Sequence, residues 1–207
     1  MNHKTKKIFT LGIWEDNAIY RQILGICSAL AVTNLMLNAF VMSLGLIFVT
    51  AFSELTVSVL RQYTPKHIRM MVQTLIISAY VIMVDLFLKA FFPSISEALG
   101  PYVGLIITNC IIMGRCESFA QKNTPVYAFA DGIASGMGYG IVLMLIAFVR
   151  ELLGFGSIFG INILGDSWVS WTLMIMPPGA FFMLAIVVWV SKNLFPDKSD
   201  KKGGAKA

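Results

Sequence analysis

Four long apolar stretches constrain this 207-residue chain more than any other feature of its sequence. They cover about residues 38–60, 68–92, 128–149 and 171–194, and each has the roughly 20 mostly apolar residues that an α-helix needs to cross a bilayer. Only 13% of the residues are charged, about half the share found in soluble domains. We therefore predict an all-α polytopic membrane protein that forms a single membrane domain over residues 1–207.

Two shorter apolar stretches, about residues 18–33 and 100–114, carry glycine or small polar residues where an ordinary span would carry leucine. We interpret both as short or broken half helices, which brings the expected number of transmembrane segments to six. Proline and glycine at 177–179 predict a kink or a break in the last segment.

The basic residues are distributed unevenly between the two sides of such a six-segment protein. If the N-terminus lies in the cytoplasm, every lysine and arginine except Lys89 and Arg150 falls on the cytoplasmic side, as the positive-inside rule requires. We therefore expect a multi-pass inner-membrane protein with both termini cytoplasmic and a disordered basic tail at 197–207. Because the net charge of +5 resides in loops and tails, it does not indicate a nucleic-acid partner.

A weak internal repeat divides the chain into two halves. The segment LGICSALAVTN (24–34) recurs as LIITNCIIMGR (105–115), and a long apolar segment follows each. Repeat A covers about residues 18–92 and repeat B about residues 100–194. Since three crossings are an odd number, the second half enters the membrane from the opposite side, which predicts an inverted 3+3 repeat with its working site near the bilayer midplane.

Two cysteines occupy matching positions in these halves. Cys27 and Cys110 each lie ten residues beyond the point where their segment enters the membrane, or about 15 Å along a helix, which is half of a roughly 30 Å hydrocarbon core. A single buried cysteine is usually a packing residue, but this pairing favours a metal site at the midplane. Iron–sulfur ligation usually takes four thiolates, so a homologous partner chain would have to supply two. Cys116 lies about 240° further around the helix and is expected to be a packing thiol.

Small polar residues flank the two cysteines. Ser28, Thr108 and Asn109 are placed to donate hydrogen bonds to cluster sulfurs, which would help to set its potential. Hydrogen bonds between helices explain these three residues equally well.

Ionisable residues inside the apolar segments are functional candidates by default. Asp85 and Asp131 could belong to a sodium path, because carboxylates are usual ligands of hard cations. The alternative is structural: Asp85 could pair with Lys89 at i+4, and Asp131 could cap the helix that it opens. Glu54 is a third such residue, for which we favour structural pairing.

Two further features are expected to serve packing and anchoring. The glycine-rich run at 132–140 lies in an apolar span, so it predicts close helix packing rather than phosphate binding. Arg61 and Arg150 are expected to anchor helix ends by snorkelling to the interface.

Several segments resemble a known family over nearly the whole chain. They are GICSALAVTN, FVTAFSELTVSVLRQYTPKHIRMMVQTLIIS, VGLIITNCIIMGR, DGIASGMGYG and RELLGFGSIFG. They resemble the family of small membrane subunits found in the sodium-translocating NADH:quinone oxidoreductases and the Rnf ferredoxin:NAD oxidoreductases. In the E subunit of the Rnf enzymes a proline follows the first cysteine, where this chain has Ser28. That serine and the short connection before Trp168 favour the quinone reductase branch.

The resemblance implies a role as an electron relay. In that family the paralogous D and E subunits are inverted repeats that hold one intramembrane [2Fe–2S] cluster between them, with two cysteines from each, which on this chain are Cys27 and Cys110. It implies a translocase of six subunits, A to F, in which electrons pass from NADH through flavin and the clusters to quinone while Na⁺ is exported. The resemblance places the flavins and the NADH and quinone chemistry on other subunits.

Two other functions would share this fold. An autonomous secondary transporter often has inverted repeats with broken helices, but transport of a solute does not need paired midplane cysteines. A structural scaffold predicts that both cysteines tolerate serine.

Overall fold

The computed structural model describes residues 24–33, 35–91, 93, 100, 102, 104–154, 157–158, 161–162 and 176–194. Its ordered elements are helices, apart from two antiparallel two-residue strands, β1 (Ser157–Ile158) and β2 (Ile161–Asn162). The helices, in chain order, are α2 (Ile26–Val32), α3 (Met36–Leu60), α4 (Arg69–Phe91), α6 (Cys110–Arg115), the π-helix η2 (Cys116–Ala120), α7 (Pro125–Gly154) and α9 (Pro177–Leu194). The prediction of a helical protein is therefore confirmed for the part that is described.

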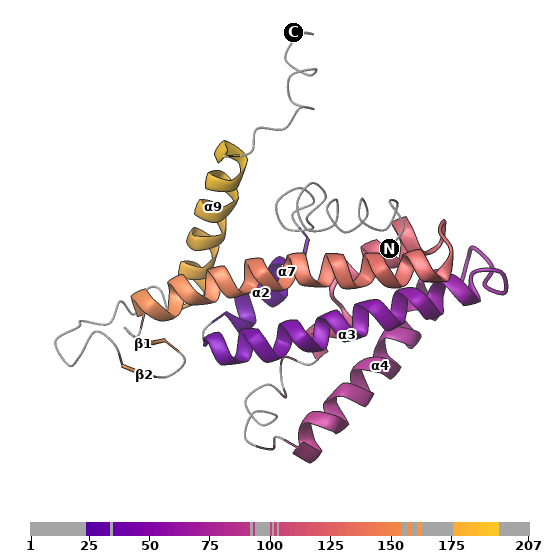
Figure 1. The fold of residues 1–207 in the computed structure, drawn as a ribbon, viewed down its shortest axis with the longest axis horizontal. Coiled ribbons are helices and arrows are strands. Elements are labelled where there is room, and N and C mark those ends of the chain that lie inside the picture. The colour runs from indigo at the N-terminus through magenta and orange to yellow at the C-terminus, as the bar shows by residue number, and fades with distance from the viewer. Residues whose placement is uncertain are drawn as a thin grey trace, which may run out of the picture.

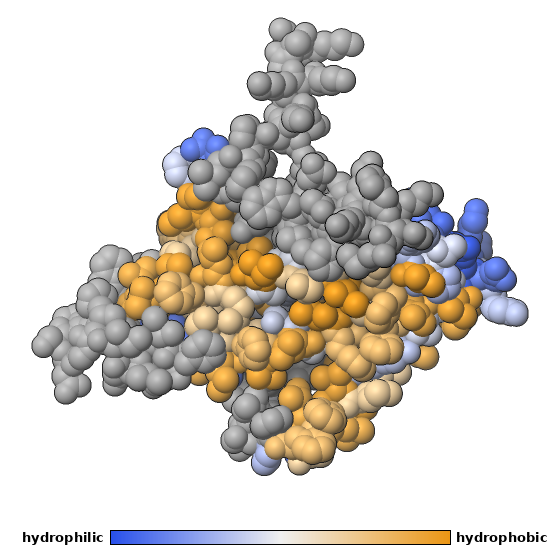
Figure 2. Space-filling model, in the orientation of Figure 1, coloured by the Kyte–Doolittle hydropathy of each residue, from blue (hydrophilic) through white to orange (hydrophobic). Residues whose placement is uncertain are grey.

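Helices α3, α4 and α7 are long and apolar enough to cross a membrane, and apolar residues make up most of the coloured surface in Figure 2. Three of the four predicted full spans thus appear as membrane-length helices. The fourth appears as the shorter apolar helix α9, which begins at Pro177, a first helical position at which the missing N–H of proline costs nothing. The proline pair therefore starts a helix here.

Parts of the predicted organisation lie outside the described residues. These parts are the start of the first segment (18–23), most of 92–103, the stretch 163–175 before α9 and the basic tail 197–207. The six-segment inverted repeat, the boundaries of its halves and the sides of the termini therefore stay predictions.

Each of the two predicted half-helix stretches contains a break shortly before its cysteine. Gly25 has a left-handed backbone (φ 77°) and precedes α2, and a Cβ on this residue would lie 2.6 Å from Cδ1 of Ile111. Glycine is required for both the conformation and the close approach. In the second stretch, residues 104–107 are helical, the chain turns at Thr108, and α6 starts at Cys110.

Helices α3 and α7 lie side by side and antiparallel, and they form the centre of the molecule (Figure 1). Glycines spaced four residues apart on α7 let the backbones touch, since a Cβ on Gly132 would lie only 2.7 Å from Cα of Ala51. The predicted close packing of the glycine-rich run is thus found. The three close pairs are Gly132 with Ala51, Gly136 with Ile47 and Gly140 with Ser43.

Two buried charged residues near the C-terminal end of α7 contact the connection between α2 and α3. Arg150 donates a 2.6 Å hydrogen bond to Oγ1 of Thr33, and Glu151 accepts the backbone N–H of Met36 at 2.6 Å. Arg150 is buried, so the expectation that it snorkels to the interface is wrong. Its guanidinium instead binds Thr33, which follows the last residue of α2.

A surface carboxylate ties α4 to η2 at the opposite end of the bundle. Glu117 accepts hydrogen bonds from Arg69 at 3.0 Å and from Gln73 at 2.9 Å. Partial burial alone would raise the pKa of Glu117, but the hydrogen bonds from Gln73 and Arg69, together with the charge of Arg69, outweigh it and lower the pKa below its ordinary value of 4.5.

This lowered pKa predicts a pH-dependent tie between α4 and η2. A carboxyl with a depressed pKa in the folded state stabilises that state above the unfolded value of 4.5, and the contribution is lost as the pH falls through the folded value. Because the side chain is 45% exposed, we expect Glu117→Gln to cost only about 0.5 kcal/mol at about pH 7 and less at about pH 3, below the unfolded pKa. Thermal unfolding of the two proteins at both pH values measures this; an equal cost at both would contradict it.

Candidate functional site

The two matched cysteines lie on the surface, and each is in the first turn of its half helix. Cys27 in α2 and Cys110 in α6 are exposed, whereas Cys116 at the start of η2 is buried. The difference follows from the helical rotation between Cys110 and Cys116, so Cys116 is the packing thiol that its spacing predicts.

A buried hydrogen-bond network joins the neighbours of the two cysteines. Nδ2 of Asn109 donates to Oγ of Ser28 at 3.3 Å, and the hydroxyls of Ser28 and Tyr139 share a 2.5 Å hydrogen bond. Both hydroxyls also lie within 3.2 Å of the Gly25 carbonyl oxygen. This network, formed by Gly25, Ser28, Asn109 and Tyr139, connects α2, α6 and α7.

Each member of the network is placed by its own helix. Oδ1 of Asn109 accepts the N–H of Ile111 at 3.0 Å and so caps α6, as asparagine commonly does. Tyr139 projects from α7 and is only 1% exposed, so its hydroxyl needs a protein partner. Ser28 follows Cys27 and Asn109 precedes Cys110, so the hydrogen bond between Asn109 and Ser28 brings the two chain segments that carry the thiols together.

The three predicted sulfur donors take different positions. Ser28 and Asn109 are buried, and their polar atoms contact the network itself. Thr108 is exposed and, with Cys110, lines an open groove of about 770 Å³. The structure therefore gives Ser28 and Asn109 a positioning role, and direct donation to a cluster stays a prediction for all three.

The two thiols by themselves do not complete a metal site. Among the residues that the structure describes, no three His, Cys, Asp or Glu side chains lie close enough together to hold a metal ion. Two exposed thiols on neighbouring helix starts fit a cluster whose remaining ligands come from another chain, because a cluster completed by this chain alone needs more thiolates.

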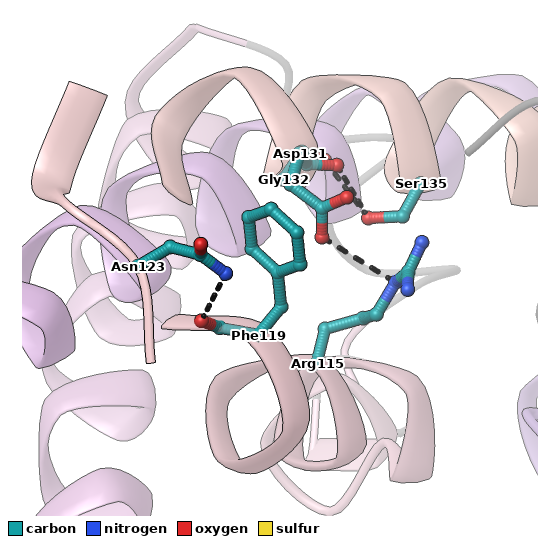
Figure 3. A network of polar contacts seen from close by, with 6 residues as sticks. All are labelled: Arg115, Phe119, Asn123, Asp131, Gly132 and Ser135. Carbon is teal, nitrogen blue, oxygen red and sulfur yellow. Dashed lines mark hydrogen bonds and ion pairs between the residues drawn. The ribbon is translucent and has the colours of Figure 1, made fainter. Parts of the chain in front are cut away.

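A second polar cluster lies at the other end of α6. Nε of Arg115 is 3.5 Å from Oδ2 of Asp131, and the two side chains point toward each other between α6 and α7 (Figure 3). Helix α7 begins at Pro125, so Asp131 lies in its second turn and the prediction that it caps the helix is wrong. Its backbone carbonyl accepts the Ser135 hydroxyl at 2.9 Å.

Asp85 lies on α4 and belongs neither to the hydrogen-bond network around Tyr139 nor to the Arg115–Asp131 ion pair. Its carboxylate is 2.6 Å from Nζ of Lys89, which is the i,i+4 pair that the spacing predicts.

Two residues of these clusters are not predicted by the sequence. Tyr139 is a tyrosine among the small residues of an apolar span. This position could have indicated a polar contact, because a buried hydroxyl needs a hydrogen-bond partner. The sequence marks Arg115 only as a cytoplasmic charge, and its burial against Asp131 depends on a contact between separate helices.

Comparison with known proteins shows the family to which the chain belongs. A family profile described as "Rnf-Nqr subunit, membrane protein" matches residues 5–188. The chain belongs to the Rnf-Nqr family.

Individual members of this family are similar over their whole length. The D subunit of the Na(+)-translocating NADH-quinone reductase of Psychromonas ingrahamii is 46% identical over 206 residues, which cover 97% of this chain and 98% of that protein. The D subunit of the Haemophilus ducreyi enzyme is 45% identical, over 97% of this chain and 99% of that protein. The D subunit of the enzyme from a Shewanella species is also 45% identical, over 96% of this chain and 97% of that protein.

The network predicts a specific cost for removing one hydroxyl. Tyr139→Phe deletes the group that pairs with Ser28 and Gly25, and we expect a loss of about 1–2 kcal/mol in unfolding free energy, because buried polar atoms lose a partner. Tyr127→Phe, a half-buried tyrosine on the same helix, is the matched control and should change stability little. Equal unfolding midpoints for the two variants would show that the network does not stabilise the half helices.

Proposed function

We propose that this chain is the D-type membrane subunit of a sodium-translocating NADH:quinone reductase, and that it carries electrons between the two sides of the membrane. The similarity to curated D subunits over nearly the full length supports this proposal. The observation that carries it is the pair of exposed thiols held by one buried network on two half helices.

Cys27 and Cys110 would supply two thiolates to a [2Fe–2S] cluster, and the paralogous E subunit would supply the other two. When bound, such a cluster accepts and releases one electron at a time. This chain's residues would hold the two thiols in place. Gly25 starts the helix that carries Cys27, and the Asn109 cap fixes the start of α6 at Cys110. The hydrogen bond from Asn109 to Ser28 joins the two helix starts, and Tyr139 holds the start of α2 against α7. Preorganised thiols lose little conformational freedom when the partner docks.

A relay of this kind answers a physical requirement, since a hydrocarbon core of about 30 Å is too thick for one efficient electron hop. The NADH, flavin and quinone sites would lie on other subunits of the complex, which would contain subunits A, B, C and F besides the D and E pair. The complex would reside in the bacterial inner membrane, and this subunit would have both termini in the cytoplasm.

The two cysteines should be individually essential. We expect Cys27→Ser and Cys110→Ser each to remove one iron–sulfur EPR signal and the matching iron from the purified complex, and to abolish quinone reduction, because serine is a poor ligand for iron in such clusters. Cys116→Ser, at the buried thiol, is the control and should keep all three. An unchanged EPR spectrum in an assembled Cys27 or Cys110 variant would contradict the relay.

The sodium path is a separate part of the proposal. Of the two candidate carboxylates, Asp131 lies in the bundle interior and Asp85 on the more exposed α4. We therefore propose that Asp131 belongs to the path: Asp131→Asn should raise the Na⁺ concentration needed for half-maximal turnover several-fold, and Asp85→Asn should raise it less. A wild-type sodium dependence in both variants would contradict this role.

A further inference from the structure

Glu54 is the most deeply buried carboxyl group that the proposed mechanism does not use. It lies on α3, six residues before the end of that helix, and its exposed fraction is 0%. Neither of its carboxyl oxygens has a hydrogen-bond partner among the residues that the structure describes.

Charged and titratable groups near Glu54 lie on three elements that pack against α3. They are Asp131 on α7, Arg115 on α6 and the thiol of Cys116 on η2. Asp131 is 3% exposed and Arg115 is 6% exposed, and the two form the ion pair shown in Figure 3. The contact between Ala51 and Gly132 joins α3 and α7 one turn from Glu54 and one residue from Asp131, which places this ion pair near Glu54 in the interior of the bundle.

An ionised carboxylate needs hydrogen-bond donors or a cation when water is absent. Arg115 already pairs with Asp131, and the negative charge of Asp131 opposes a second negative charge beside it. Glu54 has no hydrogen-bond donor of its own among the described residues. Of the two carboxyl groups, Glu54 is therefore the one that is neutral.

Glu151 provides an internal comparison. It is as deeply buried, with 1% exposure, but its Oε2 accepts the backbone N–H of Met36 at 2.6 Å, whereas Glu54 has no such donor among the described residues.

A proton is the neutralising group that fits Glu54 itself. One turn before Glu54, the backbones of α3 and α7 touch at Ala51 and Gly132. Among the described residues no three His, Cys, Asp or Glu side chains lie close enough together to hold a metal ion, so a sodium ion that passes Asp131 would not find a closed set of ligands at Glu54.

We propose that Glu54, Asp131 and Arg115 form a buried proton-binding site in which Glu54 is the carboxylic acid, Asp131 the carboxylate and Arg115 the cation. The three side chains together are neutral with the proton bound and carry one negative charge without it. The proton is held in the O–H bond of the Glu54 carboxyl group. When this bond breaks, the proton passes to water, and Asp131 and Arg115 keep their charges. This inference does not depend on the electron-transfer role.

Infrared spectroscopy of the purified intact complex tests the site. We expect the wild-type complex at neutral pH to show a carboxylic-acid C=O band that shifts in ²H₂O and that is lost in Glu54→Gln. Glu117→Gln, which removes a hydrogen-bonded surface carboxylate, is the matched control and should keep the band. Glu54→Gln should also assemble and unfold at the wild-type temperature, because an amide replaces a neutral acid of the same shape.

Further measurements keep the proposal falsifiable if Glu54→Gln fails to assemble. In wild-type complex grown with ¹³C-carboxyl glutamate, the band should move to lower frequency, and it should be insensitive to replacing Na⁺ with choline. A spectrum without a glutamic-acid band would overturn the proposal, and so would a band that appears only when Na⁺ is removed, since sodium would then be the occupant.

Discussion

A tyrosine hydroxyl in the middle of an apolar helix bundle is the constraint on which the rest of this structure depends. Water does not reach Tyr139, so its hydroxyl must bond to protein, and it finds Ser28 and the carbonyl of Gly25. Those bonds reach the start of α2, where the Gly25 carbonyl also accepts the backbone N–H of Ala29, and the Asn109 amide joins the same group of residues from the start of α6. The positions of Cys27 and Cys110 follow from these helix starts.

The frame that holds Tyr139 is the antiparallel pair of α3 and α7. Glycines on α7 let the two backbones touch, which gives the pair the close packing that drives helix association in membranes, where no hydrophobic effect acts between helices. The same pair carries Asp131 and Glu54 near one end, and Arg150 and Glu151 near the other. The pair of α3 and α7 thus supports the short helices that carry the exposed thiols, and it holds the ionisable groups in the interior of the bundle.

The features that could be predicted from the sequence depend on residues close together in the chain. The long spans follow from hydropathy, the half helices from glycine and polar residues near Cys27 and Cys110, and the packing of 132–140 from its four-residue spacing. The contacts of single charged residues could not be predicted in this way. The local sequence favours the membrane interface for Arg150 and a helix cap for Asp131. In the structure Arg150 binds Thr33 and Asp131 pairs with Arg115. Each partner lies elsewhere in the chain, and the local sequence does not indicate it.

The central claim is that this subunit supplies two thiolates, side by side at its surface, to a cluster completed by a neighbouring chain. Diffraction from crystals of the intact complex at the iron absorption edge tests it directly. The account predicts one compact anomalous peak at the boundary of this subunit, in contact with the sulfurs of both Cys27 and Cys110 and with two thiolates of the partner. Iron beside only one of these sulfurs, or a boundary with no iron at either, would contradict it.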